Sequence, residues 1–394
     1  MFKLEEPVEK KFSSFDETLS FVSEEKERLI RIPISGLWKE GARFYGDGRF
    51  GSGSTIFKLN LYGFLAICKL TGVSDDTLHR LKTPELASVV LNDLLNRVID
   101  TNERNRSQIV LDEQTGTIIG IVSDKYIGYS NDAFLKDILC CLDETNTGTL
   151  FPMTGDFIFK EAYSINSRLF LRLVSRTVRG VISGRGGTGK DVSEIGVELS
   201  NSMAGGHAVR LCWFVFRLIC ANGLVARVGG GAGRVVHAGV EKNFRNRLTT
   251  STHGLFASLI KAKRMIENLG SVQFDPVKLA KHANLEALFS IVPNRDLKKE
   301  AFERAKNKDY SSLSKRERET QRNSDAIAAL PFCLGNAETL RVFRSYWRDK
   351  PSMYDFVNIF TEHAKGLPNG QKIEAESRAG SLAAWVAENK RKFA

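Results

Sequence analysis

The sequence predicts an α+β fold with a central, mostly antiparallel sheet and a helical C-terminal region. The first observation is a run of β-rich segments from Asp156 to Asn201, separated by short turns. The second is the most apolar stretch of the chain, Leu211–Cys220, which is followed by the turn dipeptide Asn222-Gly223. The third is that apolar residues beyond position 275 recur only at helical spacing.

These patterns divide the chain into three regions. Residues 1–150 form a mixed region of helices and a hairpin, and residues 151–270 form a basic, glycine-rich β core with a long helix. Residues 271–394 form the helical C-terminal region. A chain of 394 residues is long enough to bury a core in each of two domains or in one elaborated domain.

Composition indicates a soluble globular protein, because 42% of the residues are hydrophobic and 26% are charged. The longest apolar run contains Arg217 and is too short to span a membrane. The first residues lack the apolar segment of a signal peptide, so we expect a cytoplasmic protein. The six cysteines form no CxxC pair, which favours small buried hydrophobes over disulfides or zinc ligands. We expect no cofactor.

Charge is unevenly distributed along the chain. Residues 1–159 carry 18 Lys and Arg against 24 Asp and Glu, whereas residues 160–247 carry 14 against 5. Residues 248–394 carry 25 against 17. A positive, glycine-rich middle behind an acidic first third favours a surface that binds a polyanion, although a charged surface also serves solubility.

Three short helices are expected in the N-terminal region. Asn60 is a good N-cap for the first, which ends before Gly72. Ser74 is a good cap for the second, and Thr83-Pro84-Glu85 is a typical start for the third. A hairpin of 109–111 with 117–122 follows, and Asn131 caps a further helix.

The segment Arg168–Arg179 places arginines four residues apart. This spacing puts Arg168, Arg172 and Arg176 on one face of a strand, and it would equally put them on one face of a helix. The β-branched and aromatic neighbours favour a strand, along which the guanidiniums would recur at roughly 13 Å intervals.

The central hairpin follows. Both alternating faces of Leu211–Cys220 are apolar, which indicates a strand covered on two sides. Asn222-Gly223 is expected to form the two-residue turn. The return strand leads into a loop of glycines between Arg227 and Arg234, and such a loop either presents N–H groups to an anion or is a plain hairpin tip.

A helical stripe is expected from Val240 to Gly270. Its first turns carry Lys242, Arg245 and Arg247, cations that oppose the helix dipole and that a bound anion would compensate. Further helices are expected over 338–348, 353–364 and 373–389.

A glycine-rich segment, Gly184–Lys190, has the spacing of a phosphate-binding P-loop. Two observations disfavour a nucleotide site. Asp191 stands where a Ser or Thr would hold magnesium, and the following residues predict a strand instead of a helix. We therefore expect a loop between strands, whose Arg185 and Lys190 could still contact phosphates.

No catalytic or metal-binding constellation is evident. His207, His237 and His253 form the closest group of histidines, but none has a partner at metal-ligand spacing. The sequence shows no pair of converging carboxylates for a magnesium nuclease and no serine nucleophile motif.

Short motifs carry a resemblance to a known family. They are GIVSDKY (Gly120–Tyr126), LSNS with a following Gly-Gly (Leu199–Gly206), RLICANG (Arg217–Gly223), His237, and Asn358 with Thr361-Glu362. Over about residues 50–380 the chain resembles a phage- and plasmid-associated family of unknown function. The family often has His-Asp where Met203-Ala204 stand here. No catalytic residues are established for it, so the resemblance implies only a mobile-element context, in which DNA replication, recombination and counter-defence proteins are common.

Taken together, these patterns predict sequence-independent binding of nucleic acid, single-stranded DNA above all, for protection, recombination or annealing. An assembly of several copies along the strand is compatible with this hypothesis, and no membrane partner is expected. The residues expected to contact phosphates are Arg168, Arg172, Arg176, Arg179, Arg185, Lys190, Arg227, Arg234, Lys242, Arg245 and Arg247.

Two alternatives stay open. One is a nucleotide- or nucleic-acid-processing enzyme that uses the Gly184–Lys190 loop. The other is a protein-binding counter-defence factor whose basic surface meets an acidic partner.

Overall fold

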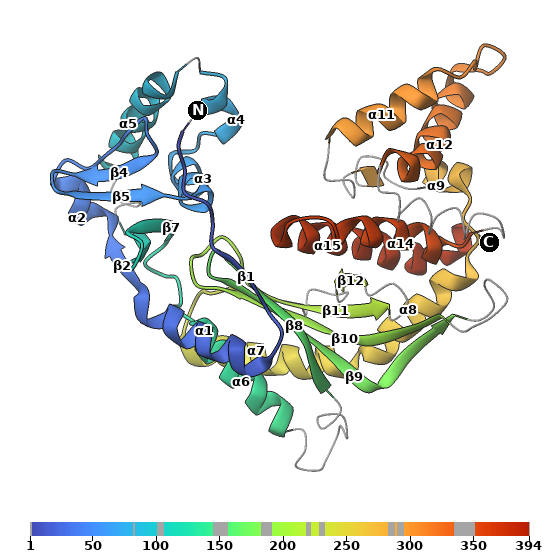
Figure 1. Ribbon diagram of the computed structural model, residues 1–394, viewed down its shortest axis with the longest axis horizontal. Coiled ribbons are helices and arrows are strands. Elements are labelled where there is room, and N and C mark those ends of the chain that lie inside the picture. The colour runs from blue at the N-terminus through green and yellow to red at the C-terminus, as the bar shows by residue number, and fades with distance from the viewer. Residues whose placement is uncertain are drawn as a thin grey trace.

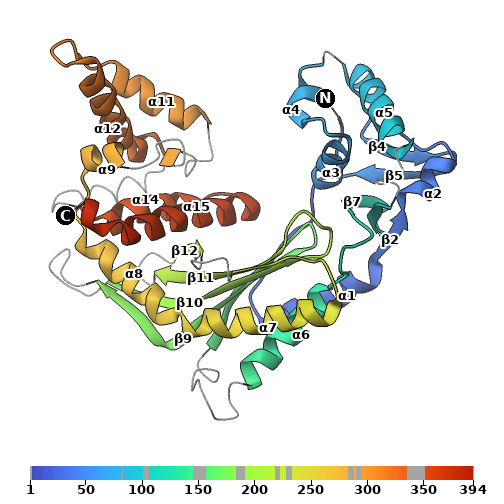
Figure 2. The same cartoon turned by 180° about the vertical axis from the view of Figure 1, so that it is seen from behind.

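The α+β prediction is confirmed by a computed structural model, in which two sheets and their helices form an open arc (Figure 1). The structure describes residues 2–81, 83–100, 106–144, 157–182, 191–217, 222–227, 233–282, 288–289, 295–334 and 351–393. The larger sheet is the base of the arc, the smaller sheet rises at one end, and the C-terminal helices rise at the other (Figures 1 and 2).

The larger sheet is antiparallel and has seven strands. In spatial order they are β1 (Glu9–Phe12), β8 (Phe157–Ile165), β9 (Arg168–Ile182), β10 (Asp191–Ser202), β11 (Val209–Arg217) and β12 (Asn222–Arg227), with β13 (Arg234–Val235) also on β11. The N-terminal region thus supplies one edge strand of this sheet, 145 residues or more before the rest of it.

The smaller sheet has six strands, and all of them come from the N-terminal region. In spatial order they are β2 (Leu29–Pro33), β6 (Gln108–Asp112), β7 (Thr117–Val122), β5 (Thr55–Leu59), β4 (Arg49–Ser52) and β3 (Arg43–Phe44). The expected hairpin is β6–β7, which is antiparallel, whereas β5 runs parallel to β7.

The helices of the N-terminal and central regions are α1 (Phe15–Arg28), α2 (Ile34–Lys39), α3 (Leu61–Thr71), α4 (Asp75–His79), α5 (Pro84–Asp100), α6 (Asn131–Glu144), α7 (Glu241–Ala257) and α8 (Leu259–Ser271). Those of the C-terminal region are α9 (Pro276–His282), α11 (Arg295–Lys306), α12 (Lys315–Cys333), α14 (Met353–Ala364) and α15 (Asn369–Glu388). Within the described ranges, none of these helices is both long and apolar enough to cross a bilayer. The helix expected over 338–348 lies outside the described residues.

Local capping signals place the N-terminal helices as expected. The Asn60 side chain accepts a hydrogen bond from the Gly63 N–H, and Gly72 ends α3 at a φ of 76°. Ser74 caps α4 in the same way, and α5 begins at Pro84 after Thr83. These positions depend only on neighbours within one turn, which is why the sequence reveals them.

The central hairpin differs from the expected one. Strand β12 begins at Asn222, which lies opposite Arg217, and Gly223 pairs with Phe216. The prediction that Asn222-Gly223 forms the turn is therefore wrong, because pairing with β11 draws both residues into the strand. Residues 218–221, between the two strands, lie outside the described residues.

The long helix expected from Val240 to Gly270 is two helices. Helix α7 ends at Ala257 and α8 begins at Leu259. The Ser258 hydroxyl between them accepts a hydrogen bond of 2.8 Å from the Trp213 indole N–H. The apolar stripe continues through both helices, since Leu255 and Leu259 are both buried in the main core.

The two faces of the larger sheet have different characters. Leu169, Leu171 and Leu173 alternate along β9 and join the main hydrophobic core with α7 and α8. The residues between them point to the other face, where α15 lies over the sheet (Figure 1). That second face is mixed, with Tyr163 and Phe170 beside charged side chains.

Arg172 is the centre of the second face and is fully buried. Its guanidinium donates to Glu161 at 2.8 Å, to Glu198 at 2.8 Å and to Glu376 of α15 at 2.5 Å. The three carboxylates outweigh the effect of burial and raise the pKa of Arg172. Buried charges persist only when they are paired and hydrogen-bonded, so this contact fixes α15 on the sheet.

The smaller sheet is joined to the larger one by the β8–β9 turn. The Asn166 side chain donates to the Ile119 carbonyl of β7 at 2.9 Å and accepts from Asn60. A Cβ added to Gly120 would lie 2.1 Å from the Ala204 carbonyl oxygen, so the next turn of the larger sheet packs directly on β7. Backbone thus meets backbone at this junction, which sets the angle between the two sheets.

Replacing Arg172 by Met tests the role of the buried ion network. The substitution leaves buried carboxylates without their partner, so we expect the free energy of unfolding to fall by about 3–5 kcal/mol. Urea denaturation followed by circular dichroism measures this change. Arg176→Met on the same strand is the control, because Arg176 is exposed and should change stability by less than about 0.5 kcal/mol. Equal stability of the two variants would contradict the assignment.

Candidate polyanion-binding cleft

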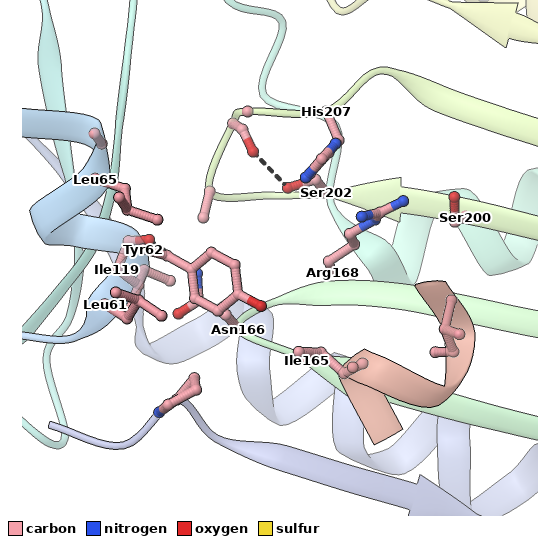
Figure 3. A pocket seen from close by; sticks show the side chains of 18 of the residues that line it. Leu61, Tyr62, Leu65, Ile119, Ile165, Asn166, Arg168, Ser200, Ser202 and His207 are labelled. Carbon is pink, nitrogen blue, oxygen red and sulfur yellow. Dashed lines mark hydrogen bonds between the residues drawn. The ribbon is translucent and has the colours of Figure 1, made fainter. Parts of the chain in front are cut away.

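A cleft of about 1130 Å³ lies between α3 and the first turns of α15. Its floor is the part of the larger sheet that α15 leaves uncovered, and β7 with the turn at 204–207 closes one end. Figure 3 shows Tyr62 and Leu61 of α3 on one side and Arg168, Ser200, Ser202 and His207 on the other. This volume slightly exceeds the roughly 300–1,000 Å³ of sites for drug-sized molecules.

Two arginines of the floor, Arg168 and Arg210, point to the open face. Arg168 pairs with Ser202 across β10, while Arg210 pairs with Ser200. Strands β9 and β11 lie on either side of β10, and the two arginines are offset by two residues along it. Their Cα atoms are therefore roughly 12 Å apart. The Arg168 guanidinium lies 4.3 Å from the centre of the Phe170 ring, and its Nε–H is buried without a hydrogen-bond acceptor.

These arginines form no ion pair within the part of the chain that the structure describes. Across the described ranges neither has a carboxylate within 4.0 Å. Burial, followed by the charge of Arg210, lowers the pKa of Arg168 to about 10. Arg168 is still protonated at neutral pH, so the floor carries a positive charge without an ion-pair partner in the described structure.

Acidic residues also line the cleft, and most of them are already paired. Glu198 is bound to Arg172, and Glu374 forms an ion pair with Arg378 one turn along α15. Glu9 is an exposed acid at the rim of the cleft. Burial raises the pKa of Tyr62, and the nearby Glu9 carboxylate raises it further. The net charge around the floor is therefore positive.

His207 lies at the closed end of the cleft and is neutral. Burial, followed by the charges of Arg168, Arg210 and Lys69, lowers the pKa of His207 to about 4. Near it, the Ser202 hydroxyl donates to the Gly205 carbonyl at 2.9 Å (Figure 3). Three cations from α3, β9 and β11 thus act on one point of the cleft.

The outer wall offers exposed apolar and aromatic surface. Leu61 and Tyr62 on α3 retain 44% and 37% of their surface. An exposed aromatic ring beside a cationic surface is a feature of grooves that bind single-stranded nucleic acids.

The expected row of arginines along β9 is not a continuous surface. Arg172 has no accessible surface, so the expectation that it contacts a phosphate has to be corrected: each of its three guanidinium nitrogens donates to a carboxylate. Arg176 and Arg179 are exposed. They lie where the pairing of β9 with β10 is irregular, away from the cleft lining. Only Arg168 of this row lines the cleft.

Arg234 extends the positive floor. Strand β13 places it directly opposite Arg210, so both side chains project from the same face of the sheet. The backbone of Arg227 lies in β12, but its side chain, Arg185 and Lys190 lie outside the described residues. The Gly184–Lys190 loop and most of the second glycine loop lie outside them as well.

The basic start of α7 belongs to a different surface. Helix α7 packs on the opposite face of the larger sheet (Figure 2). Arg245 is paired with Asp137 at 3.1 Å and Glu241 at 3.2 Å, and Arg247 donates to the Ala238 carbonyl at 3.1 Å. Lys242 is exposed there. The structure therefore separates these residues from the arginines of the cleft.

The histidines do not form a metal site. His237 is buried and stacks on Tyr126 with ring centres 4.8 Å apart, while His207 lies in the cleft. In the described part of the chain, no three His, Cys, Asp or Glu side chains are placed to hold a metal ion.

Sequence reasoning did not assign Arg210, Lys69 or Tyr62 to the site, and it weighed His207 only as a metal ligand. The alternation of residues 209–217 contained a signal for Arg210, since it shares a face with Cys212 and Phe214. No pattern in the sequence could place α3 across from that face.

Comparison with known protein families, with curated proteins and with solved structures finds no match to this chain. The resemblance to the phage- and plasmid-associated family therefore stays a prediction.

The positive field of the cleft predicts how His207 titrates. We expect its ring to protonate near pH 4, well below the usual value of about 6.5, because burial and the three cations disfavour a further charge. Arg210→Ala removes one cation, so the pKa should rise toward the ordinary value. Proton NMR of the histidine rings measures both. Arg97→Ala, on the exposed face of α5, should leave the His207 titration unchanged, and a wild-type value near 6.5 would contradict the assignment.

Proposed function

We propose that the protein binds single-stranded nucleic acid, DNA above all, in the cleft between α3 and α15. The observation that carries this proposal is the set of arginines on the open half of the larger sheet that lack carboxylate partners in the described structure. Arg168 and Arg210 lie in the cleft, and Arg234 lies beside Arg210. Such a floor attracts a polyanion, and the phosphate backbone is the common polyanion of the cell.

The position of Arg168 favours a single strand over a duplex. Its Nε–H is buried at the floor of the cleft, and a rigid duplex follows such a concave surface less readily than a flexible strand does. A flexible strand can bend into the cleft and stack bases on Tyr62 while its phosphates meet the arginines. Contacts to phosphate and stacking carry no sequence code, which supports sequence-independent binding.

A fluorescence-anisotropy titration tests the proposal. The probes are labelled single-stranded DNA, single-stranded RNA and duplex DNA. Each is roughly 20 nucleotides long, which exceeds the site sizes typical of single-strand-binding modules. We expect the single-stranded DNA to bind most tightly, with an affinity that falls steeply between about 50 and 200 mM salt. Arg168→Ala and Arg210→Ala should each weaken binding about tenfold on every sequence, since each removes a charged contact.

Arg245→Ala is the matched control, because Arg245 is equally basic but is ion-paired on the opposite face of the sheet. It should bind like the wild type. Absence of binding to any oligonucleotide at low salt would refute the proposal, and so would equal losses in the cleft variants and the control.

A further inference from the structure

Three cations act on one point of the cleft floor. Arg168, Arg210 and Lys69 act together on His207, and Glu198, the nearest acid of the floor, is held by Arg172. An internal phosphodiester brings one negative charge, whereas a phosphomonoester brings almost two at neutral pH. Three cations around one point therefore favour a doubly ionised group over a singly ionised one.

Hydrogen-bond donors are available at the same point. The Nε–H of Arg168 is buried without an acceptor, and leaving such a donor unsatisfied costs free energy. Ser200 lies between Phe170 and Arg210 in the register of the sheet and lines the cleft. Guanidinium and hydroxyl groups both donate hydrogen bonds to phosphoryl oxygens, and this point of the cleft offers two guanidiniums and one hydroxyl.

We propose that Arg168, Arg210 and Ser200 form a subsite for a phosphoryl group in the doubly ionised monoester form, as at the phosphorylated end of a strand. This subsite deepens the proposed function and rests on it for the identity of the strand. Its chemistry fits a strand end and free inorganic phosphate alike, so the experiment separates the two sources.

The first arm compares otherwise identical single-stranded oligonucleotides with 5′-phosphate, 3′-phosphate or hydroxyl ends by anisotropy. We expect one phosphorylated end to bind about tenfold more tightly than the hydroxyl end at pH 7.5. The advantage should shrink at about pH 5.5, because the second ionisation of a phosphomonoester lies near pH 6. His207 stays neutral over this range, so its own charge does not change the comparison.

Variants locate the effect. Ser200→Ala and Arg168→Lys should reduce the phosphate advantage while retaining most of the affinity for hydroxyl-ended strands, since lysine keeps the charge but loses the planar pair of donors. Arg179→Ala, an exposed arginine of the same strand outside the cleft, should keep the full advantage.

The second arm adds inorganic phosphate and follows the His207 ring by NMR. We expect bound phosphate to raise the pKa of His207, because it neutralises the cations that lower it, and to displace the phosphorylated strand. Equal affinity for phosphorylated and hydroxyl ends, with Arg168→Ala still weakening both, would overturn the subsite and leave strand binding intact. A phosphate response of His207 without any oligonucleotide binding would support the subsite and refute strand binding.

Discussion

The buried contact between Arg172 and three glutamates is the constraint on which the functional surface depends. It joins β8, β9 and β10 to α15 through a single guanidinium. Glu161 also meets Lys11 of β1 and Lys372 of α15, so the edge strand and the helix share the same network. Because α15 is fixed at this point, only part of the sheet face is covered, and the rest becomes the floor of the cleft.

The second wall of the cleft is set by a different kind of contact. Asn166 and Gly120 bring the backbone of the larger sheet against β7, with no long side chain between them. Helix α3 follows β5 and packs on β7, so its exposed face with Tyr62 is carried to the cleft by the smaller sheet. The cleft is thus defined by two rigid junctions, one ionic and one formed by backbone packing, on either side of an antiparallel floor.

The sequence revealed what local interactions determine. Asn60 and Ser74 cap helices with neighbours three residues away, and the β6–β7 hairpin joins adjacent segments. Asn222-Gly223 shows where local preference fails, since pairing with β11 overrides the turn tendency of these residues. The antiparallel centre of the α+β fold followed from residue types alone.

Only part of the candidate site could be predicted from the sequence. Arg168 was identified, but Arg172 has the same spacing signal and is buried, because its partner Glu376 lies 204 residues further along the chain. Arg210 was missed, since its proximity to Arg168 exists only through the register of β10. Charge patterns along a chain indicate that a basic surface exists, but tertiary packing decides which cations it contains.

Arg172 and Glu376 are far apart in the sequence, and this separation affects folding during synthesis. The smaller sheet uses only residues 29–122, so it can form while the rest of the chain is still being synthesised. The charged face of the larger sheet stays uncovered by α15 until Glu376 has been synthesised. Contacts of such long range form slowly, because the chain must first close a large loop. Until α15 packs on the sheet, Arg172, Glu161 and Glu198 therefore face water, and the cleft lacks one of its walls.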